Sequence, residues 1–80
     1  MLRRLISAET SSPDLFCLAG VVSESRGKKS EAESLFRKAL YLDPGHLESL
    51  AHLALLLEID GRHAAARPLR QRASKLSPTP

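Results

Sequence analysis

The sequence has 80 residues and a mass of 8.8 kDa, which allows one small domain and excludes a catalytic domain built around a cofactor pocket. Only 4% of the residues are aromatic, so we expect an aliphatic core, and the lone cysteine, Cys17, excludes a disulfide framework and a cysteine-based zinc site. The net charge of +3 arises in residues 61–80, which carry five basic side chains and no acid, whereas residues 1–60 sum to −2. We therefore expect a basic last helix in a cytoplasmic protein, with no membrane span and no nucleic-acid partner.

The first pair of predicted helices has clear start and stop signals. The first helix is predicted to begin at Ser12-Pro13-Asp14, with the serine as N-cap and the proline in the first position, and to end at Arg26-Gly27. Ser30 and Glu33 form a candidate capping box for the second helix, and Asp43-Pro44-Gly45 ends it.

A second pair of helices follows the same plan. One helix is predicted from about Leu47 to Ile59, a turn at Asp60-Gly61, and another helix from about His63 to Leu76 before Ser77-Pro78. Pro68 lies inside the last helix and removes one backbone hydrogen bond, a loss of about 3 kcal/mol in a helix interior. We therefore expect a bend or a delayed start in this helix.

The two pairs are copies of one repeat with a period of 34 residues. Residues 13–46 and 47–80 are identical at seven positions when offset by 34. The identical pairs are Glu24/Glu58, Gly27/Gly61, Ala32/Ala66, Leu35/Leu69, Ala39/Ala73, Leu42/Leu76 and Pro44/Pro78.

These residues resemble the tetratricopeptide repeat, a 34-residue helix–turn–helix unit. The matching positions are Phe16, Ala19, Gly20, Ser23, Ala32, Phe36, Ala39 and Pro44 in the first copy, and Leu50, Leu53, Ala54, Leu57, Ala66, Arg70, Ala73 and Pro78 in the second. The resemblance implies an all-α fold: a right-handed α-solenoid of antiparallel helix pairs with about five helices. It also implies that Gly20 approaches Ala32, and Ala54 approaches Ala66, so that each helix pair is tight.

Two positions depart from the family pattern. Ser23 replaces the usual Tyr, which weakens one packing contact. Arg70 stands where Phe is usual, so we expect the outer side of the last helix to face solvent or a partner.

The register gives three segments: residues 1–12, then the repeats 13–46 and 47–80. Leu2, Leu5 and Ile6 continue the repeat register backwards, so we expect residues 1–12 to be a helix remnant or cap that packs on the first repeat. A frayed terminus is the alternative for these residues.

The family binds peptides or helices of partner proteins in a concave groove lined by the first helix of each pair. The resemblance assigns the groove to Asp14, Cys17, Val21, Glu24, Ser25, Glu48, Ala51, Leu55, Glu58 and Ile59. An apolar floor flanked by acids favours a partner with apolar and basic residues. The alternative is that the acids are only solvated.

A narrower resemblance concerns residues 35–44 and 52–58, LFRKALYLDP and HLALLLE. They are similar to the repeats at the C-terminus of bacterial chemoreceptor methyltransferases, which methylate receptor glutamates with S-adenosylmethionine. This resemblance implies a regulatory or docking tail that contacts a chemoreceptor or signalling protein.

Catalysis, cofactors and metals are not expected in these 80 residues. The histidines His46, His52 and His63 form no metal-protease motif, and no phosphate-binding glycine loop is present in the sequence. Cys17 is expected to be a small buried thiol.

An oligomerisation or scaffold module of an unrelated bacterial repeat protein is the other interpretation. The sequence shows no extra helix after the second repeat, so we expect Leu69, Ala73 and Leu76 to be partly uncovered. A second copy covering that last helix would form a homodimer.

Overall fold

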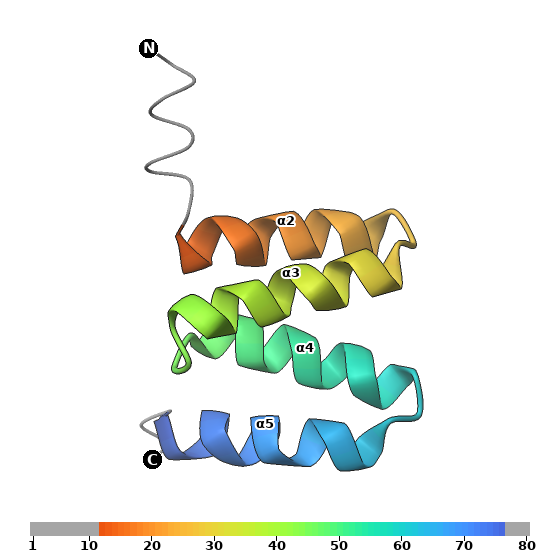
Figure 1. Ribbon diagram of the computed structural model, residues 1–80. Helices are drawn as coiled ribbons and strands as arrows, with labels where there is room; N and C mark the ends of the chain where they lie inside the picture. The colour runs from red at the N-terminus through yellow and green to blue at the C-terminus, as the bar shows by residue number, and fades with distance from the viewer. Residues whose placement is uncertain (1–11, 77–80) are drawn as a thin grey trace.

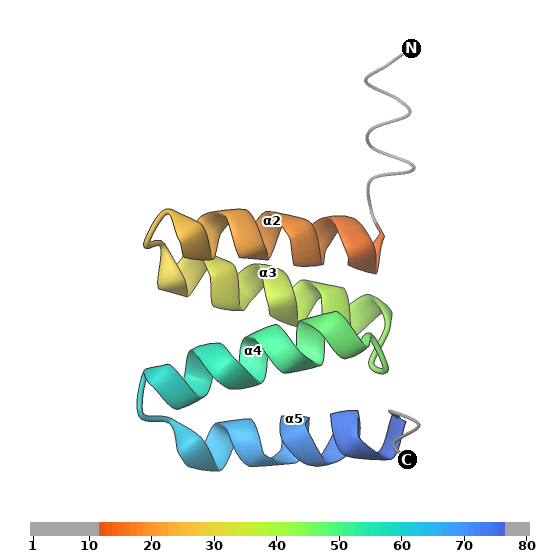
Figure 2. The same ribbon diagram turned by 180° about the vertical axis from the view of Figure 1, so that it is seen from behind.

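The computed structural model describes residues 12–76, which form four α-helices stacked in chain order (Figure 1). These are α2 (Pro13–Ser25), α3 (Lys29–Leu42), α4 (Leu47–Ile59) and α5 (His63–Leu76). Each helix contacts the next, and α2 also contacts α4. Figure 2 shows the same stack of helices from behind. The all-α solenoid of antiparallel helix pairs is confirmed. The helix expected in residues 1–12 and the stop at Ser77-Pro78 lie outside the described residues.

The predicted ends of α2 and α4 are confirmed. The Ser12 hydroxyl accepts a hydrogen bond from the Leu15 N–H at 3.2 Å, which is the expected N-cap. Gly27 and Gly61 follow the first helix of each pair with φ of 77° and 82°, a backbone conformation that glycine adopts without strain. The equivalent positions of the two repeats therefore make the same turn.

The predicted capping box of α3 is wrong. The helix begins at Lys29, one residue before Ser30, and its N-cap residue Lys28 makes no side-chain capping bond. The Glu33 carboxylate instead accepts hydrogen bonds from Arg37 and Arg62. Two arginines offer this carboxylate charge-assisted bonds, which are stronger than a neutral bond to a backbone amide.

The delayed start predicted for α5 is also wrong. The helix begins at His63 and runs through Pro68 to its end at Leu76. The first turn is held because the Ala66 N–H donates to the Arg62 carbonyl at 3.2 Å, and Ala66 itself is buried in the core. Ala66 is the one buried residue of this turn, so its burial and this hydrogen bond anchor the start of the helix.

Phe36 fills the space that Gly20 leaves on α2. A Cβ at Gly20 would lie 2.6 Å from the Phe36 ring, so only glycine fits without movement. The Phe36 ring also stacks on the His52 ring of α4, with the ring centroids 5.5 Å apart. The Phe36 ring supplies the atoms nearest to this position, a neighbour of Gly20 that the sequence did not predict.

The last helix is better covered than the sequence suggested. Leu69 is only 9% exposed and belongs to the core, Ala73 is half-buried, and Leu76 is exposed. The uncovered apolar surface of α5 is therefore smaller than predicted, because α4 covers the Leu69 side chain.

None of the helices in residues 12–76 is long and apolar enough to cross a membrane.

Candidate protein-binding face

All ten residues assigned to the groove lie on α2 and α4, which are the first helices of the two repeats and contact each other. We call this surface the α2–α4 face. Its members are Asp14, Cys17, Val21, Glu24 and Ser25 on α2, and Glu48, Ala51, Leu55, Glu58 and Ile59 on α4.

The apolar part of the α2–α4 face is carried mainly by α4. Leu55 and Ile59 are 45% and 61% exposed, one helical turn apart, and Ala51 is exposed one turn before them. Val21 on α2 is half-buried and packs against the core. Cys17 is buried and belongs to the core, so it contributes no floor to this face, contrary to its assignment from the sequence.

Two of the four acids on this face are bonded to basic groups of the same chain. The Asp14 carboxylate lies 2.6 Å from the His46 Nε2 atom. The Glu58 carboxylate accepts two hydrogen bonds from Arg70, from Nη2 at 2.8 Å and from Nε at 3.0 Å. The Arg70 hydrogen bond also holds the pKa of Glu58 below its usual value. Arg70 is exposed, as expected, and its guanidinium reaches back to α4.

The other polar residues of the face leave charge available to a partner. Glu48 is exposed and Glu24 is half-buried, and neither makes a side-chain hydrogen bond or ion pair within residues 12–76. The Ser25 hydroxyl donates to the Val22 carbonyl at 2.8 Å. The face thus combines exposed apolar side chains with two carboxylates that make no ion pair or side-chain hydrogen bond within residues 12–76.

A chain of polar contacts joins the repeats beside this face. His46 caps α4, and its Nδ1 atom lies 2.8 Å from the Ser49 hydroxyl while Nε2 contacts Asp14. Burial raises the pKa of the Cys17 thiol, opposed by its hydrogen bond with Ser49. The His46–Asp14 contact was not predicted from the sequence, but the 34-residue offset pairs His46 with Ser12, the N-cap residue of α2.

The atoms that could bind a metal ion gather at the same place. Ligand atoms of Asp14, His46 and Glu48 lie within 4.8 Å of one another. Both carboxylates are exposed, and the His46 nitrogen is already bonded to Asp14. Within this cluster the His46–Asp14 contact joins the two repeats.

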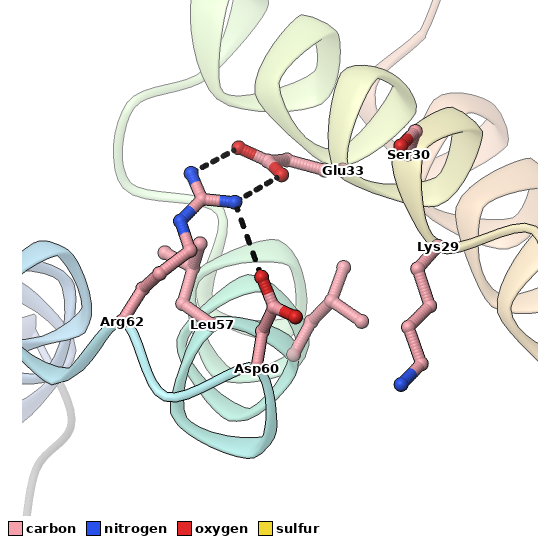
Figure 3. A pocket seen from close by; sticks show the side chains of 7 residues that line it. Lys29, Ser30, Glu33, Leu57, Asp60 and Arg62 are labelled. Carbon is pink, nitrogen blue, oxygen red and sulfur yellow. Dashed lines mark hydrogen bonds and ion pairs between the residues drawn. The ribbon is translucent and has the colours of Figure 1, made fainter.

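A second contact between the repeats is made by Arg62, which follows the C-terminal end of α4, whereas His46 precedes its N-terminal end. Figure 3 shows this contact. The Arg62 guanidinium donates to both Glu33 oxygens, at 2.9 and 3.0 Å, and pairs with Asp60 at 3.6 Å. The hydrogen bond from Arg62 lowers the pKa of Glu33. This bridge joins α3 to the α4–α5 turn and so links the two repeats.

Three relatives match most of this chain. It is 47% identical over 72 residues to the probable biofilm formation methyltransferase WspC of Pseudomonas aeruginosa, and 41% identical over 73 residues to WspC of Pseudomonas putida. It is 31% identical over 68 residues to tetratricopeptide repeat protein 7B of Homo sapiens. These matches cover 90%, 91% and 85% of the chain but only 17%, 17% and 8% of the relatives. No protein-family model and no solved structure matches the chain.

Proposed function

We propose, on the premise that this chain is a tetratricopeptide module resembling part of bacterial methyltransferases, that the α2–α4 face binds a segment of a partner protein. The observation that carries the proposal is the exposure of Leu55 and Ile59. Both lie on α4, whose neighbouring residues Leu53, Leu56 and Leu57 are buried. Apolar side chains exposed together on an otherwise buried helix are typical of an interaction surface.

The charge of the face favours a basic partner. Glu48 lies two turns before Leu55 on the same helix, and Glu24 projects from α2. A partner segment with apolar anchors and flanking Lys or Arg would cover Leu55 and Ile59 and meet both carboxylates. The attraction between the charges should weaken at high salt.

We also propose that the module is the non-catalytic docking tail of a chemoreceptor glutamate methyltransferase. The support is the 47% and 41% identity to the two WspC proteins, which are described as probable methyltransferases. The chain spans about a sixth of the length of each. Methyl transfer from S-adenosylmethionine then belongs to the rest of such a protein. Deletion of the matched segment from the Pseudomonas aeruginosa relative should leave methylation by purified enzyme intact at high receptor concentration. Loss of methyl transfer under that condition would contradict a docking role.

The partner-binding proposal is tested with a double variant, Leu55→Arg with Ile59→Arg. Both side chains are exposed, so the helix content and thermal midpoint should stay close to those of the original chain. Binding to the partner, measured by affinity capture and then by calorimetry with the captured protein, should fall at least tenfold.

Tyr41→Arg is the matched control. Tyr41 is 86% exposed on α3, away from the α2–α4 face, so this variant adds the same kind of charge without touching the face. Equal loss of binding in the control and the double variant would overturn the proposal. Unchanged binding by the double variant would overturn it as well.

The oligomerisation alternative makes a different prediction. If the same face or the exposed Leu76 joins two copies of the chain, light scattering should show a mass that rises with concentration. A constant monomer mass with retained partner binding would favour the docking function.

A further inference from the structure

A second apolar surface lies on the side of α2 that faces away from α4. Leu15, Leu18 and Val22 are 38%, 59% and 44% exposed, at the spacing that aligns them along one face of the helix. Together with Leu35 of α3 they form the apolar part of a hollow of about 560 Å³. Its remaining lining residues are Ala19, Ser23, Arg26, Lys28 and Glu31. None of these residues belongs to the α2–α4 face, so the hollow is a separate surface.

The repeat itself shows what kind of element fits this hollow. The offset of 34 residues pairs Leu15 with Ser49, Leu18 with His52 and Val22 with Leu56. Ser49 and Leu56 are 0% and 3% exposed, and His52 stacks on Phe36 of α3. The same face is therefore covered in the second repeat, where α3 packs against α4. A helix packed on α2 in the way that α3 packs on α4 would cover this hollow.

The α3 residues that fill the equivalent position are buried and apolar. Phe36, Ala39 and Leu40 are 0%, 0% and 9% exposed. Their partners at an offset of 34 are Leu2, Leu5 and Ile6, three apolar residues with the same spacing.

The polar residues between them follow the same register. Arg3 and Arg4 pair with Arg37 and Lys38, which are both exposed on α3. Residues 1–8 thus repeat the two-sided pattern of the last two turns of α3. A helix with this pattern can bury one side and leave its charges in water.

We propose that residues 1–8 of this chain form a helix that docks in the hollow, with Leu2, Leu5 and Ile6 against Leu18 and Val22. Residues 1–11 lie outside the described residues, and the repeat register is what places them here. The inference does not depend on the proposed partner-binding function.

A second copy of the chain is a poorer occupant. If two copies stacked in line, α5 of one copy would lie on α2 of the other. In α5 the equivalents of Phe36 and Leu40 are Arg70 and Ser74. Arg70 is exposed and bonded to Glu58. Burying this polar face against Leu15, Leu18 and Val22 would leave charged groups without water.

The test is a double-mutant cycle on the full 80-residue chain. One change is Leu18→Ala, and the other is the triple change Leu2→Ser, Leu5→Ser and Ile6→Ser. If the helix covers Leu18, Leu18→Ala should raise the unfolding equilibrium constant about tenfold in the original chain, and less than threefold in the triple variant. Urea unfolding at several protein concentrations gives both constants.

The matched control replaces Arg3 and Arg4 by Ser, which should leave the effect of Leu18→Ala unchanged. Equal effects of Leu18→Ala in the original chain and the triple variant would overturn the proposal. An unfolding midpoint that rises with protein concentration would also overturn it, since a second copy would then occupy the hollow.

A measurement on the unmodified chain does not depend on the stability of the variants. Methyl NOE contacts are expected between Ile6 and the methyl groups of Leu18 or Val22. In a mixture of labelled and unlabelled chains these contacts should remain intramolecular. Their absence, or their appearance only between chains, would contradict the docking of residues 1–8.

Discussion

Helices α2 and α4 hold the same place in their repeats but have different surroundings. Helix α4 lies between α3 and α5 and buries six residues, among them Leu50, Leu53 and Leu57. Helix α2 buries three, of which Gly20 and Ser23 offer little apolar area. The comparison shows that position in the repeat sets which side chains point inward, while the neighbouring helix decides how much is buried. Stability therefore centres on α4, whereas both helices carry exposed apolar side chains.

The two ends of the helix stack differ in the same way. The outer side of α2 is apolar and hollow, whereas the outer side of α5 carries Arg70, which is bonded to Glu58. The first end is suited to receiving another helix, and the second is suited to water. The two end surfaces of the helix stack therefore differ in polarity, although the repeats are equivalent.

The largest expected effect is the loss of a buried leucine from α4. Leu57→Ala removes a side chain that is 0% exposed and should lower the free energy of unfolding by about 2–5 kcal/mol, measured by urea unfolding. The control is Leu55→Ala on the same helix, where a side chain 45% exposed should contribute about 1 kcal/mol or less. Similar losses in both variants would contradict the assignment of the core to the inner side of α4.

A smaller effect is expected where α2 meets α3. Gly20→Ala places a Cβ 2.6 Å from the Phe36 ring and forces the ring to move. The resulting strain of about 1–3 kcal/mol should exceed the gain of about 1 kcal/mol from replacing glycine in a helix. Circular dichroism melting should show a lower midpoint. In a Phe36→Leu background the same change should be far less harmful, and an equal drop there would contradict the close approach.

The smallest effect concerns acidification of the bridge between repeats. Because the pKa of Glu33 is lowered in the folded chain, the ionised carboxylate favours folding at pH values above its ordinary pKa of about 4.3. That contribution, about 1 kcal/mol or less for a pair near the surface, is lost as the pH falls through the lowered pKa.

Arg62→Gln removes the main cause of the shift and should reduce this loss. Urea unfolding between about pH 6 and pH 3 measures it. An identical pH profile for the variant and the original chain would show that Arg62 does not set the behaviour of Glu33.

The helix boundaries could be predicted because their signals are local. Ser12, Gly27 and Gly61 act on backbone groups within a few residues, and the structure confirms each of them. The repeat register also placed all ten groove residues on α2 and α4. These features follow from spacing along the chain.

Contacts between helices could not be predicted in the same way. Glu33 lies three residues after Ser30, which is the spacing of a capping box, but the fold brings Arg62 to its carboxylate. Arg70 likewise reaches back to Glu58 across the helix pair. Such pairings depend on how helices pack, and a long flexible side chain has several partners in reach. The spacing alone does not choose among them.

The central claim is that α4 presents Ile59 and Leu55 to a partner protein. The most direct measurement places the photo-crosslinking residue p-benzoylphenylalanine at Ile59 or, as a control, at Tyr41, both exposed in the structure. The account predicts a crosslinked partner from position 59 and none from position 41, with the crosslink in a segment that carries apolar and basic residues. Crosslinking of the same partner with equal yield from both positions would contradict the account.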